Sequence, residues 1–213
     1  MDDHIRQIMR THIDTTLEAL RKNQMQGFFV EDNTALERLL DELISDGESV
    51  SVGGSVTLTE TGTLEYLKRR SIRYLDRYAP GLTPEETTEL FRQALLCDTY
   101  VTSTNAITKA GELYNVDGRG NRVAAMTFGP KQVIVIAGVN KLVGDLEEAK
   151  QRVRDIAAPA NAVRLSRETP CTKTGYCSDC RSPGRICSFY SVTGRQNVKD
   201  RIKVILLPDS FGY

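Results

Sequence analysis

The sequence lacks the features that would place it in a membrane or direct it out of the cell. No apolar run is long enough to span a bilayer, and the first residues have neither the basic start nor the unbroken apolar core of a secretory signal. Basic and acidic residues number 28 each, so the net charge is zero and no global field attracts nucleic acid. We therefore expect a cytoplasmic protein with no membrane partner and no nucleic-acid partner.

Internal repeats and low-complexity tracts are also absent. The 213 residues, 40% of them hydrophobic, are enough to bury one substantial core. We expect an α/β domain over residues 1–165. Residues 166–213 are expected to form a cysteine-rich segment and a final strand that belong to the same domain.

Helical and strand patterns alternate along most of the chain. Apolar residues recur at spacings of three and four from Asp2 to about Lys22, which predicts an N-terminal helix with one buried stripe. Short β-prone runs occupy residues 27–30, 49–52, 72–75, 99–103, 132–137 and 202–207, and helical segments occupy residues 34–44, 59–69, 83–96 and 145–156. This order predicts an α/β fold with a doubly wound parallel sheet, in which residues 132–137 form a strand buried on both faces.

Turn-forming residues give three further expectations. Residues 117–121 predict a tight loop that joins two short strands. The helix over residues 145–156 is expected to end at residues 158–161. Periodicity then disappears between Leu165 and Ile202, so the intervening segment is expected to be irregular and to need a metal centre to hold it.

Three polar loops follow predicted strands and should meet at the carboxyl edge of the sheet, where α/β proteins bind ligands. The candidate ligand-binding residues in and beside these loops are Gly53, Gly54, Ser55, Thr59, Glu60, Asn105, Asn140 and Lys141. Thr59 and Glu60 lie near the start of a helix, so backbone amides there could face an anion.

Charged residues lie close to these loops in the sequence. Glu112 and Asp117 are candidate catalytic residues, because a carboxylate near bases can act as a nucleophile or a general base. Arg119 is a further candidate ligand-binding residue, and Arg122 and Lys141 are the other bases near these acids. A purely structural role for Asp117, in which its carboxylate shapes the turn, is equally consistent with the sequence.

Four of the five cysteines lie close together, at Cys171, Cys177, Cys180 and Cys187. A reducing cytoplasm favours metal ligation or redox chemistry over structural disulfides. Cys177 and Cys180 form a tight clamp, and the wider flanking gaps favour an iron-sulfur cluster of the 4Fe-4S type. Structural zinc is the second possibility. The third is that the cysteines bind no metal and form a disulfide or act as redox thiols. Cys97 reads as a buried, inert residue.

Several stretches together carry a family resemblance. They are Val52-Gly53-Gly54-Ser55 with Thr59-Glu60, residues 102–108 (Thr-Ser-Thr-Asn-Ala-Ile-Thr), residues 111–122, and residues 129–131 leading to Gly138-Val139-Asn140-Lys141. Over nearly its whole length the chain resembles the LUD family of lactate-utilisation proteins. It is similar to the short, stand-alone members common in anaerobic bacteria, which end in the same cysteine-rich segment and a Gly-Tyr pair.

This resemblance implies a fold similar to ribose-5-phosphate isomerase, glucosamine-6-phosphate deaminase and the CoA transferases. It also implies a link to the oxidation of lactate or related hydroxy acids beside iron-sulfur partner proteins. The expected partners are a small organic acid or another anionic metabolite and a redox protein, and a homodimer stays open.

Three functions remain in contention, and whether the protein is an enzyme is undecided among them. The first is a redox accessory protein that binds an iron-sulfur cluster through the four cysteines. The second is an enzyme that binds a phosphorylated or CoA-linked small molecule at the strand-end loops, with zinc or a cluster bracing the tail. The third is a sensor that binds a metabolite and acts through a partner.

Overall fold

The computed structural model describes residues 2–213, apart from the side chain of Asp3. Its centre is a six-stranded sheet in the order β1-β10-β7-β4-β2-β3, in which all neighbouring strands pair in parallel. The strands are β1 (Gln26–Phe29), β2 (Ser49–Val52), β3 (Arg73–Leu75), β4 (Thr99–Thr102), β7 (Gln132–Gly138) and β10 (Ile202–Leu207). The predicted α/β fold with a parallel-sheet core is confirmed.

Strands β7 and β10 lie inside the sheet and are buried on both faces. Val133 and Val135 point to one face, where they pack with Val204 and Leu206. Ile134 points to the opposite face. This alternation explains the unbroken apolar run in the sequence, because successive side chains of a strand face opposite sides and both sides are covered here.

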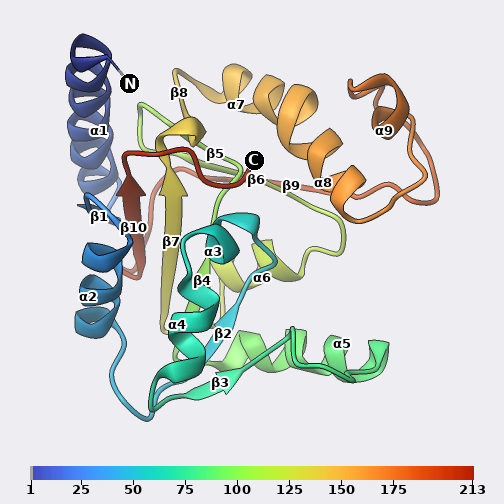
Figure 1. Ribbon diagram of the computed structural model, residues 1–213, viewed down its shortest axis with the longest axis horizontal. Helices are drawn as coiled ribbons and strands as arrows, with labels where there is room; N and C mark the ends of the chain where they lie inside the picture. Colours follow the sequence, from blue (N-terminus) through green and yellow to red (C-terminus); the bar gives the residue numbers. More distant parts are fainter. Residues whose placement is uncertain (1) are drawn as a thin grey trace.

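Helices cover both faces of the sheet. On one face, α1 (Asp3–Lys22) buries Ile13, Leu17 and Leu20. Full burial of such a side chain contributes about 1.5–3 kcal/mol. On the other face lie α2 (Asn33–Leu43), α3 (Val56–Glu60) and α4 (Thr63–Arg69). Figure 1 shows α2 and α4 alongside the sheet.

The helix predicted over residues 59–69 is two helices, and the prediction of one continuous helix was wrong. Gly62 separates α3 from α4 with φ of 71°. A left-handed backbone cannot continue a right-handed helix, and glycine adopts it with little strain. The break lets Thr57 and Tyr66 belong to differently oriented helices, both with buried side chains.

The helix α5 (Pro84–Gln93) begins as the sequence predicts. The Thr83 hydroxyl accepts from the Glu86 amide at 3.1 Å, and the Glu86 carboxylate accepts from the Thr83 amide at 2.8 Å. This reciprocal cap satisfies amides that a helix leaves free at its start. A 3-10 turn, η1 (Ala94–Leu96), extends the helix to the predicted end.

A second, four-stranded sheet lies beyond the carboxyl ends of the main strands. Its order is β8-β5-β6-β9, with β5 (Ala106–Thr108), β6 (Leu113–Asp117), β8 (Leu142–Val143) and β9 (Phe189–Thr193). The helix α7 (Leu146–Arg152) packs on it through Ala149, against Ala106 and Tyr114. In Figure 1 the helices of this part lie past the arrowheads of β7 and β10, so this layer roofs the edge where a ligand is expected.

The loop at residues 117–121 does not join two strands, which corrects that prediction. It joins β6 to the helix α6 (Asn121–Thr127), and Gly120 adopts φ of 82° at the helix start. The Asp117 carboxylate accepts from the amides of Arg122 at 2.9 Å and Val123 at 3.2 Å. These bonds supply the acceptors that the amides in the first turn of a helix lack. The turn-forming residues 117–121 therefore begin a helix and do not form a hairpin.

The helix after Asp145 continues past the point where the sequence predicted its end. A π-helical turn, η3 (Val153–Ala157), leads directly into α8 (Ala158–Arg164). Pro159 is the second residue of α8, which directly follows the π-helical turn. The prediction that residues 158–161 end the helix was wrong, and the added turns carry two residues of the site described below.

The cysteine-rich segment is less irregular than expected. It contains a single helical turn, α9 (Cys171–Thr174), and the strand β9, which pairs antiparallel with β6. The final strand β10 then enters the interior of the main sheet. Within the described residues, no helix combines the length and apolarity that crossing a membrane requires.

Candidate functional site

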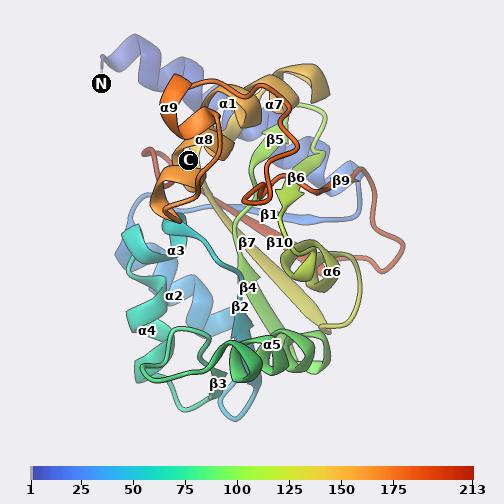
Figure 2. The ribbon, with the colours of Figure 1, turned by 90° about the vertical axis from the view of Figure 1, so that its right-hand side faces the viewer.

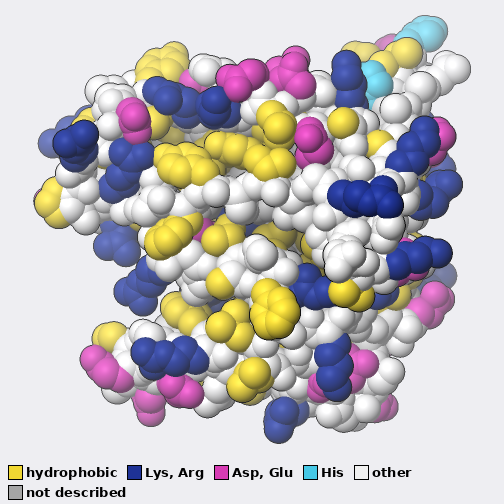
Figure 3. Space-filling model, turned by 180° about the vertical axis from the view of Figure 1, so that it is seen from behind, with side chains coloured by type: hydrophobic (Ala, Val, Ile, Leu, Met, Phe, Trp, Pro, Cys, Tyr) yellow, Lys and Arg dark blue, Asp and Glu magenta, His cyan; other side chains and the backbone are white. Residues whose placement is uncertain are grey.

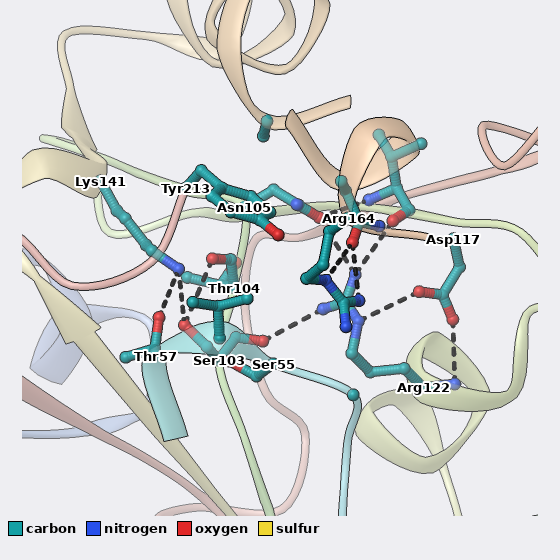
Figure 4. Close-up of a pocket in the computed structure, with 15 residues that line it drawn as sticks. Ser55, Thr57, Ser103, Thr104, Asn105, Asp117, Arg122, Lys141, Arg164 and Tyr213 are labelled. Atoms are coloured by element: carbon teal, nitrogen blue, oxygen red, sulfur yellow. Dashed lines mark hydrogen bonds and ion pairs between the residues drawn. The ribbon is translucent and has the colours of Figure 1, made fainter. Parts of the chain in front are cut away.

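The loops after β2, β4 and β7 meet in one cleft at the carboxyl edge of the main sheet. Gly54 and Ser55 come from the first loop, Asn105 from the second, and Lys141 from the 3-10 turn η2 (Val139–Lys141) that follows β7. The cleft has a volume of about 90 Å³. Side chains from α8 and the C-terminal tail complete its wall, and Figure 4 shows how they converge.

Lys141 is the most deeply buried charged side chain of the cleft, with 2% of its surface exposed. Its Nζ donates to Thr57 Oγ1 and to Ser103 Oγ, each at 2.9 Å. Burial lowers the pKa of Lys141 to about 7, and the nearby guanidinium groups of Arg152 and Arg122 lower it further, against a weaker opposing effect of Glu60. The amine is therefore readily deprotonated near neutral pH.

Arg122 organises the wall opposite Lys141 and is itself buried. Its Nε pairs with Asp117 Oδ1 at 3.0 Å, and its Nη2 donates to Asn105 Oδ1 at 3.0 Å. The Asn105 oxygen also accepts from the Val116 amide at 2.9 Å. Two donors thus fix the side-chain oxygen of Asn105, which leaves its Nδ2 as the group available to a ligand in the cleft.

Asp117 is fully engaged in this network. One carboxylate oxygen accepts from Arg122 Nε and the other from two backbone amides of α6. These contacts favour a structural role over a catalytic one, since a base or nucleophile needs a free oxygen. Asp117 therefore holds Arg122 and the start of α6 in place.

Arg164 and Asn161 reach the cleft from α8. The Arg164 guanidinium donates to Asn161 Oδ1, from Nε at 3.0 Å and from Nη2 at 2.7 Å. Tyr213 lines the cleft beside them. Among the described residues, neither Arg164 nor Lys141 has a carboxylate within ion-pairing distance. The hydrogen bonds of these two basic side chains therefore go to neutral groups.

Gly53 lies just behind the cleft, where β2 and β4 approach closely. A Cβ on Gly53 would overlap Thr102 Oγ1 and come within 3.1 Å of the Tyr100 hydroxyl. A Cβ on Gly54 would meet only the Arg77 guanidinium, at 3.4 Å. The two glycines differ, because Gly53 is required by packing while Gly54 leaves backbone open to the cleft.

Several candidate residues lie outside the cleft. The Glu112 carboxylate accepts from Thr108 Oγ1 at 2.9 Å in the β5–β6 hairpin, and Arg119 is exposed on its loop. Thr59 is exposed on α3. The sequence could not separate these from the cleft residues, because a distance along the chain says little about where a hairpin tip points.

Asn140 and Glu60 hold the C-terminal tail and do not line the cleft. Asn140 Nδ2 donates to the Gly212 carbonyl at 2.9 Å, and Glu60 Oε2 accepts from the Gly212 amide at 2.6 Å. These bonds place Tyr213 at the cleft wall. Figures 1 and 2 agree that the tail lies between α3 and α8.

Sequence reasoning missed Arg164, Asn161, Tyr213 and Thr57. The helix that carries Asn161 and Arg164 was predicted to end before them, so their spacing of three was not recognised as one helix face. The tail residue carries no local pattern at all. Ser103 and Thr104 do lie in one of the polar loops that the sequence indicates, and the run of hydroxyl side chains there was the available signal.

The four clustered cysteines line one small cavity on the far side of α8, together with Thr169 and Arg185. Arg185 ties the segment together, because its guanidinium donates to the carbonyls of Cys180 and Cys187. Burial raises the pKa of the Cys187 thiol to about 11, and the neighbouring Cys177 raises it further. In the described part of the chain, no three His, Cys, Asp or Glu side chains lie close enough to hold a metal ion.

Cys97 does not line this cavity. It packs in the core on the face of the main sheet that α1 covers. Its Sγ is within 3.1 Å of the Ala94 carbonyl, and burial raises the pKa of its thiol to about 11. A buried, protonated thiol is a poor nucleophile and a poor ligand. The location agrees with the inert role expected from the sequence.

One helix separates the cleft from the cysteine cavity. Ala157, Asn161 and Arg164 face the cleft, whereas Ala158 and Ala162 line the cysteine cavity. Residues three or four apart share a helix face, so α8 presents one side to each site. A helix with its side chains is about 10–12 Å wide. Because Ala158 and Ala162 have short side chains, α8 separates the two sites by less than a helix with larger residues would.

Comparisons with known proteins agree on the fold. The profile of the LUD domain matches residues 13–207. The crystal structure of a DUF162 family protein from Deinococcus radiodurans superposes with a TM-score of 0.52 at 14% sequence identity, covering 95% of this chain and 98% of the other. At this identity the likeness shows the fold alone.

A second structure, eIF2B beta from Chaetomium thermophilum, gives a TM-score of 0.37 at 13% identity, covers 55% of this chain and 44% of its own, and supports no argument. None of the curated proteins matches the chain.

Proposed function

The chain belongs to the LUD domain family, and from this premise we propose that it binds a small organic acid, lactate or its oxidised counterpart pyruvate, in the cleft as part of organic-acid redox metabolism. The observation that carries the proposal is a pair of basic side chains, Lys141 and Arg164, whose hydrogen-bond partners are hydroxyls and an amide. A carboxylate would supply the charged partner that the Arg164 guanidinium lacks and accept its hydrogen bonds. Asn105 Nδ2 adds a third donor.

The size of the cleft favours a small ligand. A volume of about 90 Å³ suits a compact acid better than a whole CoA thioester. A phosphorylated metabolite is also an anion and would meet the same basic side chains. It is the competing ligand, and its binding would favour the alternative of an enzyme or a sensor. Surface charge adds no preference for nucleic acid, because basic and acidic side chains both occur across the face shown in Figure 3.

Isothermal titration with L-lactate, D-lactate, pyruvate, inorganic phosphate and CoA tests this proposal directly. We expect binding of a hydroxy or oxo acid, and a dissociation constant at least tenfold higher in Arg164→Met, because a hydrogen bond to a charged group contributes about 1.5–3 kcal/mol. Lys109→Met, on an exposed lysine, is the matched control and should leave the constant unchanged. Binding of CoA or phosphate without any binding of the acids would overturn the proposal.

We also propose that Cys171, Cys177, Cys180 and Cys187 bind a 4Fe-4S cluster. Soft sulfur donors are the ligands that such clusters use, all four cysteines line one cavity, and Arg185 would offset the negative charge of thiolates. Binding would have to draw the sulfurs closer together than they lie in this structure. The cluster, when bound, would supply one-electron redox chemistry one helix away from the acid. Electrons would then pass to a redox protein partner.

Anaerobic purification followed by iron, zinc and acid-labile sulfide analysis tests the metal site. We expect brown protein with iron and sulfide, and loss of both in Cys177→Ser, since the segment has few other ligands. Cys97→Ser should keep its metal, because Cys97 lies in the core. Colourless protein containing one zinc ion, or protein without metal, would overturn the cluster.

A further inference from the structure

We infer that Lys141 is a nucleophile whose amine forms an imine with the carbonyl carbon of a 2-oxo acid such as pyruvate. The inference rests on the proposed function, because it assigns a chemical step to the same cleft. It goes beyond that function, since an ionic contact with a carboxylate requires no covalent bond to Lys141. The geometry around Nζ carries the argument.

The two hydroxyls that contact Lys141 can act only as acceptors toward it. Thr57 Oγ1 donates its own proton to the Phe211 carbonyl at 3.1 Å, and Ser103 Oγ donates to the Thr104 carbonyl at 3.4 Å. Each hydroxyl therefore receives one N–H from Nζ. A neutral amine has two N–H groups, so both are used and the nitrogen lone pair is left over.

Lys141 lines the cleft, so the lone pair of its Nζ is close to where a ligand would bind. Figure 4 shows Nζ held between Thr57 and Ser103 beside Thr104 and Asn105. An ammonium would make the same two contacts and would direct a third N–H, in place of the lone pair, at a ligand. The hydroxyl pair orients the neutral amine, which is the reactive form of a lysine nucleophile.

The charges of the cleft favour the same form. Burial and the neighbouring Arg152 and Arg122 lower the pKa of Lys141, so a large share of the amine is neutral at neutral pH. Arg164 and Asn105 Nδ2 lie in the same cleft and can hold the carboxylate of the acid. The carbonyl next to that carboxylate would then face the amine.

The reaction balances without an oxidant or reductant. The lone pair of Nζ adds to the carbonyl carbon, and the proton lost from nitrogen moves to the former carbonyl oxygen, which gives a carbinolamine. That oxygen leaves as water together with the second proton of the nitrogen, which forms the C=N bond. Ser103 and Thr57 are placed to hold the amine at the start of the reaction, and lactate cannot react because it has no ketone carbonyl.

Reductive trapping tests the inference on the wild-type protein. Pyruvate and sodium cyanoborohydride are added at pH 8, and the product is analysed by intact mass and peptide mapping. We expect one adduct of reduced pyruvate on Lys141, none with lactate, and none in Lys141→Arg. The exposed residues Lys109 and Lys150 serve as internal controls and should carry at least tenfold less label.

Two outcomes separate this inference from the proposed function. If calorimetry shows that wild-type protein binds pyruvate but Lys141 is not labelled, the covalent step is wrong and the binding site stands. If pyruvate and lactate both fail to bind, both proposals fail. Equal labelling of Lys141, Lys109 and Lys150 would also overturn the inference, and this comparison does not depend on how any variant folds.

Discussion

The oxygen of the Asn105 side chain is fixed by Arg122, whose Nη2 donates to it at 3.0 Å. Asn105 follows a strand of the main sheet, and Arg122 belongs to a helix that Asp117 anchors. The contact turns Asn105 Nδ2 toward the cleft, so an arginine that is itself buried determines which end of the amide a ligand meets.

Replacing Asn105 with Asp should weaken acid binding without unfolding the protein. The aspartate would keep an oxygen for Arg122, but its second oxygen would face the ligand in place of a donor. We expect the dissociation constant for pyruvate or lactate to rise at least tenfold, because a lost hydrogen bond to a charged group costs about 1.5–3 kcal/mol. Calorimetry measures the constant, and Asn197→Asp, on an exposed loop, should change nothing.

Lys141 should make the protein more stable as the pH rises above neutrality. The folded protein has a Lys141 pKa of about 7, whereas lysine in the unfolded chain titrates at about 10.4. Between these values the unfolded chain binds one more proton, so the free energy of unfolding rises by up to about 1.4 kcal/mol per pH unit. Below pH 7 both states hold the proton and this contribution is flat.

Urea unfolding at pH 7, 8 and 9 tests that linkage by comparing wild-type protein with Lys141→Met. The difference between the two proteins removes contributions from the thiols and from other groups. We expect the methionine variant to be the more stable at pH 7 and its advantage to shrink toward pH 9. An advantage that is constant over this range would contradict the pKa assignment.

Arg185 should hold the cysteine segment in place even in metal-free protein. Its Nε donates to the Cys187 carbonyl at 2.8 Å, and its Nη2 contacts Asp179 and Tyr190, each at 2.8 Å. Arg185→Gln removes several of these bonds at about 1 kcal/mol each, so amide hydrogen exchange over residues 177–190 should accelerate about tenfold. Exposed Arg181→Gln is the control, and equal exchange in both variants would show that Arg185 does not order the segment.

Gly53 and Gly54 should differ in their tolerance of alanine. The Cβ of Gly53→Ala would overlap the Thr102 side chain, and such overpacking typically costs about 1–3 kcal/mol. Gly54→Ala would meet only the flexible end of Arg77, and we expect a change within about 0.5 kcal/mol. Urea unfolding of both variants checks the contrast, and equal losses would mean that the loop after β2 moves freely.

The sequence by itself determined the elements whose patterns are local. Residues 49–52 and 202–207 are strands with the predicted bounds, and the helix predicted from residue 83 begins there, with Thr83 as its cap. A period of two, a period of 3.6 or a capping box depends on neighbours in the chain, so no distant contact is needed to recognise it. The meeting of strand-end loops also follows from sequence, because parallel strands end at one edge.

The tertiary structure decided which side chains face the cleft. Glu112, Arg119 and Asn140 stand beside cleft residues in the sequence but point elsewhere, because hairpin and tail contacts set their direction. Arg164 and Tyr213 enter the cleft from the far end of the chain. The groups that surround the buried Lys141, among them Thr57, Ser103 and Arg122, come from distant parts of the chain, and no window of the sequence contains all of them.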